Sequence, residues 1–95
     1  MKSIYTIVGM KHRGTEKLVA SMNVGEPLIL IREPTNQHDP NAVQVWGRHT
    51  HLGYVKGTEA VALAFAMDAT LVQSKLAIFA IGDRWPAAEV EESAP

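Results

Sequence analysis

Short runs of β-branched and aromatic residues, separated by glycine, proline and asparagine, constrain the fold of this chain most strongly. Such runs favour strands, and the turn residues between them favour hairpins over long crossover connections. Apolar residues at helical spacing occur in only two segments, residues 15–22 and 59–67. The sequence therefore predicts the element order β-α-β-β-β-α-β, with strands at residues 4–8, 27–32, 42–46, 52–55 and 71–81.

This order of elements predicts a mainly β protein with two short helices, of the α+β class. Because hairpins join the strands, we expect a small, largely antiparallel β-barrel whose openings the helices cover. A chain of 95 residues buries enough surface for one hydrophobic core and too little for two. We therefore expect one domain over residues 1–86, followed by an acidic, disordered tail over residues 87–95.

Charge is divided unevenly along the chain. Nine Lys and Arg residues stand against ten Asp and Glu residues, which gives a formal net charge of −1. Three of the acids, Glu89, Glu91 and Glu92, belong to the expected tail, so residues 1–86 carry a net charge of +2. A mildly basic body of this kind permits contacts with phosphate groups without requiring them.

The first residues lead directly into a predicted strand, so we expect no targeting segment. No apolar run approaches the roughly 18 residues that a membrane-spanning helix needs. The default expectation is a cytoplasmic protein without a membrane partner.

Catalytic and metal-binding chemistry finds little support in the sequence. The absence of cysteine excludes disulfides, thiolate zinc sites and a cysteine nucleophile. His38 and Asp39 pair an imidazole with an acid, but no serine lies in a nucleophile motif. His49 and His51 lie in an expected hairpin turn and lack a third ligand of predictable position. We expect no catalytic residue, metal or cofactor, and a hydrolase built on His38 and Asp39 is a disfavoured alternative.

The polar segment from residue 32 to 41 allows two interpretations. As an ordered turn, Asn36 and Asp39 would cap backbone amides while Pro34 and Pro40 stiffen the chain. As a functional loop, the same side chains would contact a ligand, because ordered polar loops often carry function.

Two glycine-flanked stretches are the other candidates. Lys11, His12 and Arg13 lie between Gly9 and Gly14, and are either a solubilising basic turn or an anion site. Tyr54 and Lys56 lie between Gly53 and Gly57; the tyrosine is either part of the core or a platform on which a base stacks.

Taken together, these stretches resemble the HIRAN domain over residues 7–81, nearly the whole chain. The most specific block is NQHDPNAVQV at residues 36–45. The other matching segments are VG at residues 8–9, G at residue 25 with the apolar strand that leads into REP at residues 32–34, LGYV at residues 52–55, ALA at residues 62–64, and MD at residues 67–68.

The resemblance implies an OB-like β-barrel that captures the free 3′ end of single-stranded DNA, as the domain does in eukaryotic fork-remodelling translocases. It also implies a short stand-alone protein of the bacterial type. Carried over position by position, Asp39 would accept a hydrogen bond from the terminal 3′-hydroxyl. His12 and Arg13 stand where the DNA-end readers have aromatic residues. The complete set of expected DNA-binding residues is Lys11, Arg13 and Lys56 on phosphate, His12, His38 and Tyr54 around a base, and Asn36 and Asp39 in the loop.

The expected function is thus a non-enzymatic module that binds single-stranded DNA and its 3′-hydroxyl end in repair or replication-fork processing. A helicase or nuclease is the expected type of protein partner. The alternative is an interaction adaptor that docks a DNA-processing partner and does not itself bind DNA.

Overall fold

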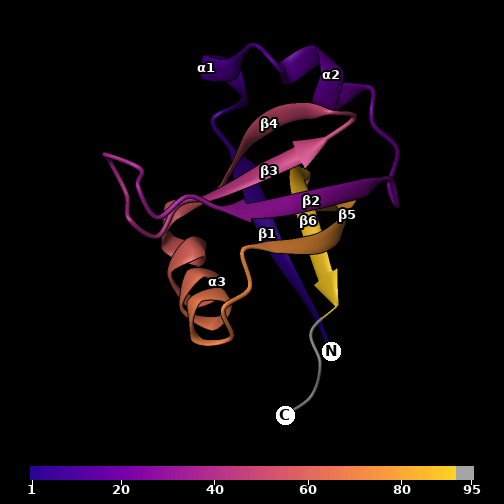
Figure 1. The fold of residues 1–95 in the computed structure, drawn as a ribbon. Coiled ribbons are helices and arrows are strands. Elements are labelled where there is room, and N and C mark those ends of the chain that lie inside the picture. Colours follow the sequence, from indigo (N-terminus) through magenta and orange to yellow (C-terminus); the bar gives the residue numbers. More distant parts are fainter. Residues whose placement is uncertain (92–95) are drawn as a thin grey trace.

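Over the part of the chain that the structure describes, the protein folds into a closed barrel of six strands with three helices at its ends (Figure 1). The computed structural model describes residues 1–91. Every strand pair is antiparallel, and the order around the barrel is β1-β4-β3-β2-β5-β6. In chain order the elements are β1 (Lys2–Val8), α1 (Met10–Arg13), α2 (Glu16–Ala20), β2 (Pro27–Arg32), β3 (Val43–Gly47), β4 (Thr50–Val55), α3 (Gly57–Ala69), β5 (Ser74–Gly82) and β6 (Trp85–Glu91). The predicted antiparallel barrel is confirmed.

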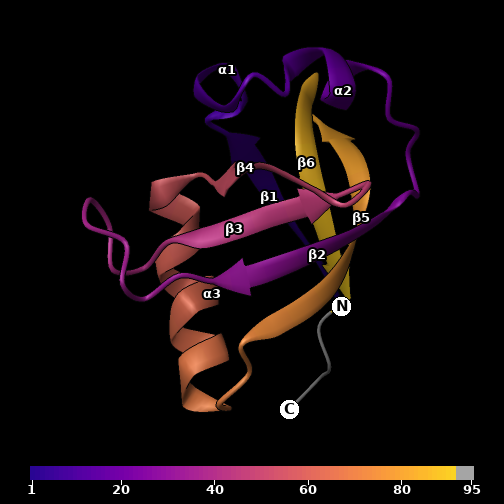
Figure 2. The same ribbon diagram turned by 45° about the horizontal axis from the view of Figure 1, so that its top comes forward.

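Alternate residues of the strands point into one core, as the period of two in a strand requires. The largest fully buried side chains include Ile7, Leu30, Leu52 and Phe79. The helices cover opposite ends of the barrel, with α1 and α2 at one end and α3 at the other (Figures 1 and 2). The buried side chains of α3 that join the core are Ala60, Leu63, Ala64 and Met67.

The contact between β1 and β4 depends on a glycine. The two strands pair at Ile7 with Val55 and at Val8 with Tyr54. A Cβ atom on Gly53 would lie 2.3 Å from the carbonyl oxygen of Val8. Only glycine lets the two backbones approach this closely. Gly53 is therefore required for the pairing of β1 with β4 beside Tyr54.

The expectation of a disordered tail is wrong for residues 87–91. These residues belong to β6, which pairs with both β1 and β5 and closes the barrel. Ala88 and Val90 are fully buried, whereas Glu89 and Glu91 point outward. The acidic residues therefore occupy the solvent side of the strand. Because several acids lie close together there, the sequence predicts a tail, and that prediction misses the alternation of buried and exposed residues. The rest of the predicted tail, residues 92–95, lies outside the described residues.

Two further boundaries differ from expectation. The basic turn after β1 is the short helix α1, whose flanking residues Gly9 and Gly14 have φ values of 82° and 70°. These left-handed conformations suit glycine and let the chain enter and leave one helical turn abruptly. The predicted last strand begins later, at Ser74, because Leu71 has a φ of 56° and ends the turn after α3. Within the described residues, no helix is long and apolar enough to cross a membrane.

Candidate nucleic-acid interface

A pocket of about 260 Å³ opens where four elements meet. These are the end of β1, the strand β4, the loop between β2 and β3, and the first residue of α3. Four of the predicted site residues line it together, and other lining positions come from the barrel wall and the helix. The lining residues are Val8, Asn36, His38, Asp39, Ala42, Tyr54, Val55 and Gly57.

Asn36 and Asp39 shape the loop that forms one side of this pocket. The side-chain oxygen of Asn36 accepts hydrogen bonds from the backbone amides of His38 and Asp39, each at 2.9 Å. Asp39 Oδ1 accepts from the backbone amide of Asn41 at 2.8 Å. The turn-capping interpretation is therefore correct for both side chains. It accounts for only one oxygen of Asp39: Oδ2 has no hydrogen bond within the described residues and faces Gly57, where an added Cβ would lie 3.7 Å away.

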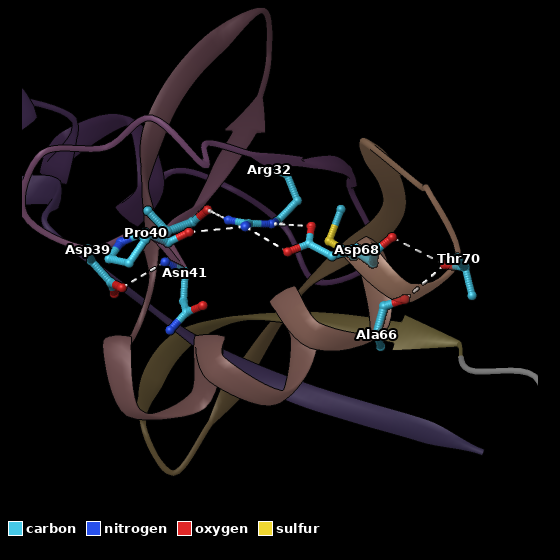
Figure 3. A network of polar contacts seen from close by, with 9 residues as sticks. Arg32, Asp39, Pro40, Asn41, Ala66, Asp68 and Thr70 are labelled. Carbon is cyan, nitrogen blue, oxygen red and sulfur yellow. Dashed lines mark hydrogen bonds and ion pairs between the residues drawn. The ribbon is translucent and has the colours of Figure 1, made fainter.

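Arg32 holds this loop from inside the protein (Figure 3). Its side chain is only 3% exposed, and its Nη atoms donate to the carbonyls of Ala42 at 2.8 Å and Pro40 at 3.0 Å. Its Nε and Nη2 atoms also donate to the two carboxylate oxygens of Asp68 on α3, both at 2.9 Å. The guanidinium thus joins the loop to the helix by a bidentate contact and fixes the backbone on either side of Asn41. The ion pair raises the pKa of Arg32 and lowers that of Asp68.

Glu33 connects the loop to Tyr54. Its carboxylate accepts hydrogen bonds from the side-chain amides of Gln44 and Asn36, and from the Tyr54 hydroxyl at 3.1 Å. Burial opposes ionisation of Glu33, but these donors together outweigh it and lower its pKa. Burial and the Glu33 carboxylate both raise the pKa of Tyr54. The Tyr54 hydroxyl is therefore hydrogen-bonded within the protein, and Tyr54 contributes its ring to the pocket wall.

An aromatic row extends from Tyr54 along the outer surface of β4 and β3. The ring of His51 meets Tyr54 edge-on at 5.0 Å between centroids, and stacks on Trp46 at 5.2 Å. Trp46 in turn donates to Gln44 at 2.7 Å. Burial and the nearby Arg13 guanidinium lower the pKa of His51, which favours the neutral ring at pH 7. Within the described residues, no group of three His, Asp or Glu side chains is placed to hold a metal ion.

The predicted basic residues do not line the pocket but lie on the neighbouring elements. Lys11, His12 and Arg13 are exposed on α1, and Lys56 is exposed immediately before α3. Arg13 Nε donates to the carbonyl of His51 at 2.9 Å, which ties α1 to β4 next to the aromatic row. Cationic side chains thus lie on α1 and at the residue between the pocket-lining Val55 and Gly57.

Sequence reasoning missed the residues that support the pocket. The sequence assigns no supporting role to Arg32, Glu33, Gln44 or Gly57, although the structure places all four around the pocket or its loop. A signal for Arg32 was available, because it follows Leu28 and Leu30 at alternate positions of the strand and therefore points inward with them.

The fold and the pocket define a class: a small, closed antiparallel barrel with a loop-rimmed pocket beside one capping helix. The chain belongs to the HIRAN domain family, whose sequence profile matches residues 2–84. Membership in this family implies nucleic-acid binding. No curated protein is significantly similar in sequence.

Two solved structures share the fold. A crystal structure of a protein from Lactobacillus plantarum has a TM-score of 0.71 and 24% sequence identity, over 96% of this chain and 100% of that one. The crystal structure of the HIRAN domain of human HLTF has a TM-score of 0.64 and 24% identity, over 96% of this chain and 77% of that one. Both alignments extend beyond the range of the family match, in agreement with a fold that includes β6.

Proposed function

We propose that this chain is a non-enzymatic module that captures the 3′-hydroxyl end of single-stranded DNA. The observation that carries the proposal is the second carboxylate oxygen of Asp39, which lines the pocket without a hydrogen bond from the described residues. A terminal 3′-hydroxyl donates a hydrogen bond to such an oxygen. A terminal phosphate cannot donate in the same way once it is ionised, and its charge is repelled by the carboxylate.

The residues around Asp39 are suited to contact the base and the phosphates next to the 3′ end of the DNA. The ring of Tyr54 offers a stacking surface for a base, and His38 lies at the exposed rim of the pocket. Lys11, Arg13 and Lys56 would neutralise backbone phosphates, with His12 beside them on α1. Only a few cations adjoin the pocket, which suits a grip on one strand end better than the coating of a long strand. We place this activity in DNA repair or replication-fork processing, with a helicase or nuclease as partner.

The test compares two otherwise identical fluorescent oligonucleotides that end in a 3′-hydroxyl or a 3′-phosphate. We expect tighter binding of the hydroxyl end by the wild-type protein, and a loss of affinity with rising salt. The Asp39→Asn variant keeps an oxygen to cap Asn41 but can place an amide donor where the free acceptor was. It should fold normally and lose the preference for the hydroxyl end.

Each outcome has a defined meaning. Equal wild-type affinity for both ends would remove end capture and leave general DNA binding. No binding of either oligonucleotide at low salt would overturn the DNA proposal and favour the interaction adaptor. Asp39→Ala, which also removes the cap of Asn41, serves as the control for loss of loop structure.

A further inference from the structure

The outer surface of the barrel is apolar where β2 and β5 lie side by side. Ile29 is 43% exposed, Leu76 77% and Ile78 39%. Solvent-facing strand positions are ordinarily polar when a sheet has one face in the core. Contiguous exposed apolar surface of this kind marks an interaction site.

The register of the strands arranges this surface in rows. Ile29 lies between Trp46 of β3 and Leu76 of β5. In the next row, Pro27 pairs with Ile78, which in turn pairs with Glu89 of β6. The surface therefore has an apolar centre on β2 and β5, flanked by β3 and β6.

The two flanks differ in charge and each carries a groove. A groove of about 530 Å³ on the β3 side is lined by Glu26, Pro27, Ile29, Ile31, Trp46, Gly47, Arg48 and His49. A groove of about 340 Å³ on the β6 side is lined by Lys2, Leu76, Ala77, Ile78, Glu89 and Glu91. Arg48 is the cation of the first flank and pairs with Glu26, Nε to Oε2 at 2.9 Å. Glu89 is the inner acid of the second and lies 3.8 Å from Lys2.

We propose that a second copy of this chain covers this surface, related by a two-fold axis that runs along the strands between β2 and β5. Such a rotation places the β3 flank of one copy over the β6 flank of the other. It leaves positions along the strand direction unchanged, so each row of one copy faces the same row of the other. Arg48 then faces the partner copy's acidic flank, and the exposed Leu76 faces Ile29 in the lining of the larger groove. Because the interface is isologous, both contacts occur twice.

Charge and shape are thus self-complementary on a single face. Cation and acid lie at opposite edges of the surface, and an exposed leucine lies beside a groove that has apolar walls. The exposed side of α3 has no such complement, because the helix carries two acids, Glu59 and Asp68, and no lysine or arginine that could face them in a second copy. The convex barrel offers less than the roughly 800 Å² per partner of a standard interface, so we expect a weak dimer.

The dimer surface and the DNA-end pocket lie on different sides of the barrel. The pocket adjoins β1, β4 and the loop that follows the end of β2, whereas the rows of the dimer surface lie at Pro27 and Ile29, toward the start of β2 and away from that loop. Both pockets of a dimer would therefore remain open. The inference does not rest on the proposed function, and its test requires no DNA.

Sedimentation velocity across a concentration series measures the self-association. We expect a dissociation constant of roughly 10–500 μM for the wild-type protein. Leu76→Glu should weaken association at least tenfold. Phe65→Glu is the matched control, because Phe65 is 76% exposed on α3, outside the proposed surface. A wild-type protein that stays monomeric at about 1 mM would overturn the proposal, as would equal association by wild type and Leu76→Glu, or a loss confined to Phe65→Glu.

A charge exchange tests the orientation of the two copies. Arg48→Glu and Glu89→Arg should each weaken self-association, since each places like charges opposite one another twice. A mixture of the two variants restores opposite charges at both contacts and should form heterodimers more tightly than either variant forms homodimers. Circular dichroism verifies that both variants are folded. Folded variants that associate no better when mixed would rule out this arrangement.

Discussion

Gly53 and Gly57 lie four residues apart, yet the structure gives them different roles. A side chain on Gly53 would collide with the backbone of β1, because its Cβ would lie 2.3 Å from the Val8 carbonyl oxygen. Among the described residues, a Cβ atom on Gly57 would meet only Asp39 Oδ2, at the ordinary contact distance of 3.7 Å. The first glycine is required by the barrel, and the second leaves space beside the oxygen proposed to receive the DNA end.

Alanine substitutions should separate these roles. Gly53→Ala should lower the free energy of unfolding by about 1–3 kcal/mol, since two backbones must move apart. Gly57→Ala should leave stability unchanged or raise it by up to about 1 kcal/mol, because alanine has less freedom than glycine in the unfolded chain. The same variant should weaken binding of the 3′-hydroxyl oligonucleotide by about three- to tenfold by narrowing the pocket. Urea unfolding and fluorescence anisotropy measure the two effects; full DNA affinity in Gly57→Ala would contradict the pocket assignment.

The predicted site residues fall into two groups once the structure is known. Asn36, His38 and Asp39 of the loop block and Tyr54 of the separate LGYV segment line one pocket. The predicted residues that do not line it are Lys11, His12, Arg13 and Lys56. Motif membership did not show that the Asn36 oxygen is already bonded to the loop backbone, nor that the Tyr54 hydroxyl is bonded to Glu33. These hydrogen bonds depend on which groups lie close together in the folded chain, and residue spacing in the sequence does not specify them.

The loop between β2 and β3 is ordered by two networks that begin at neighbouring residues of the chain. Arg32 points inward and joins the loop to α3. The Glu33 carboxylate accepts hydrogen bonds from the side chains of Gln44, Asn36 and Tyr54. The alternation of the strand directs the two side chains to opposite faces. One charged dipeptide therefore anchors both sides of the candidate site.

The Arg32 contacts predict an order of stabilities. Arg32→Met should lower the free energy of unfolding by about 2–4 kcal/mol, because it removes the donors to the Ala42 and Pro40 carbonyls together with the ion pair. Asp68→Asn should cost less, since the Asp68 side chain is 53% exposed and Arg32 keeps both carbonyl contacts. Chemical denaturation of both variants checks the order. Equal losses would show that the ion pair, and not the loop carbonyls, carries the effect of Arg32.

The lowered pKa of Glu33 predicts a dependence of stability on pH. Because its folded-state pKa lies below the ordinary value of 4.5, the carboxylate stabilises the fold fully above that value. This contribution is lost as pH falls through the lower, folded-state pKa. Urea unfolding from about pH 7 to about pH 3 should show a shallower loss of stability for Glu33→Gln than for wild type. Part of the loss should remain in the variant, because Arg48 lowers the pKa of Glu26 to about 2 and Arg32 lowers that of Asp68.

Closure of the whole barrel depends on its last strand. β6 pairs with β5 before it and with β1 at the start of the chain. At its first residue, the Trp85 indole donates to the carbonyl of Ile7 at 2.7 Å, across a separation of 78 residues. Without β6 the edges of β1 and β5 would lose their partners and the core would be open to water.

Two truncations test this closure. A chain that ends after Arg84 should fail to give the cooperative unfolding transition of the full-length protein, because it lacks the buried Ala87, Ala88 and Val90. A chain that ends after Glu91 retains every described contact of the barrel and serves as the control. Circular dichroism and thermal unfolding measure the outcome. A stable, cooperatively folded chain after removal of β6 would contradict its proposed role in closing the barrel.

Local patterns in the sequence were sufficient for five of the six strands in the described residues, for the long helix, for the single core and for the loop block that identifies the family. They suffice because the alternation of apolar side chains depends only on near neighbours in the chain. The closure by β6, the buried position of Arg32 and the meeting of Asp39 with Gly57 appear only in the tertiary structure. Each requires contacts between segments distant in sequence, as in the span from Arg32 to Asp68 and from Ile7 to Trp85. Burial and strand pairing between such distant segments exist only in the folded chain. The acidic residues near the end of the sequence therefore predicted a tail, although residues 85–91 form the strand that closes the barrel.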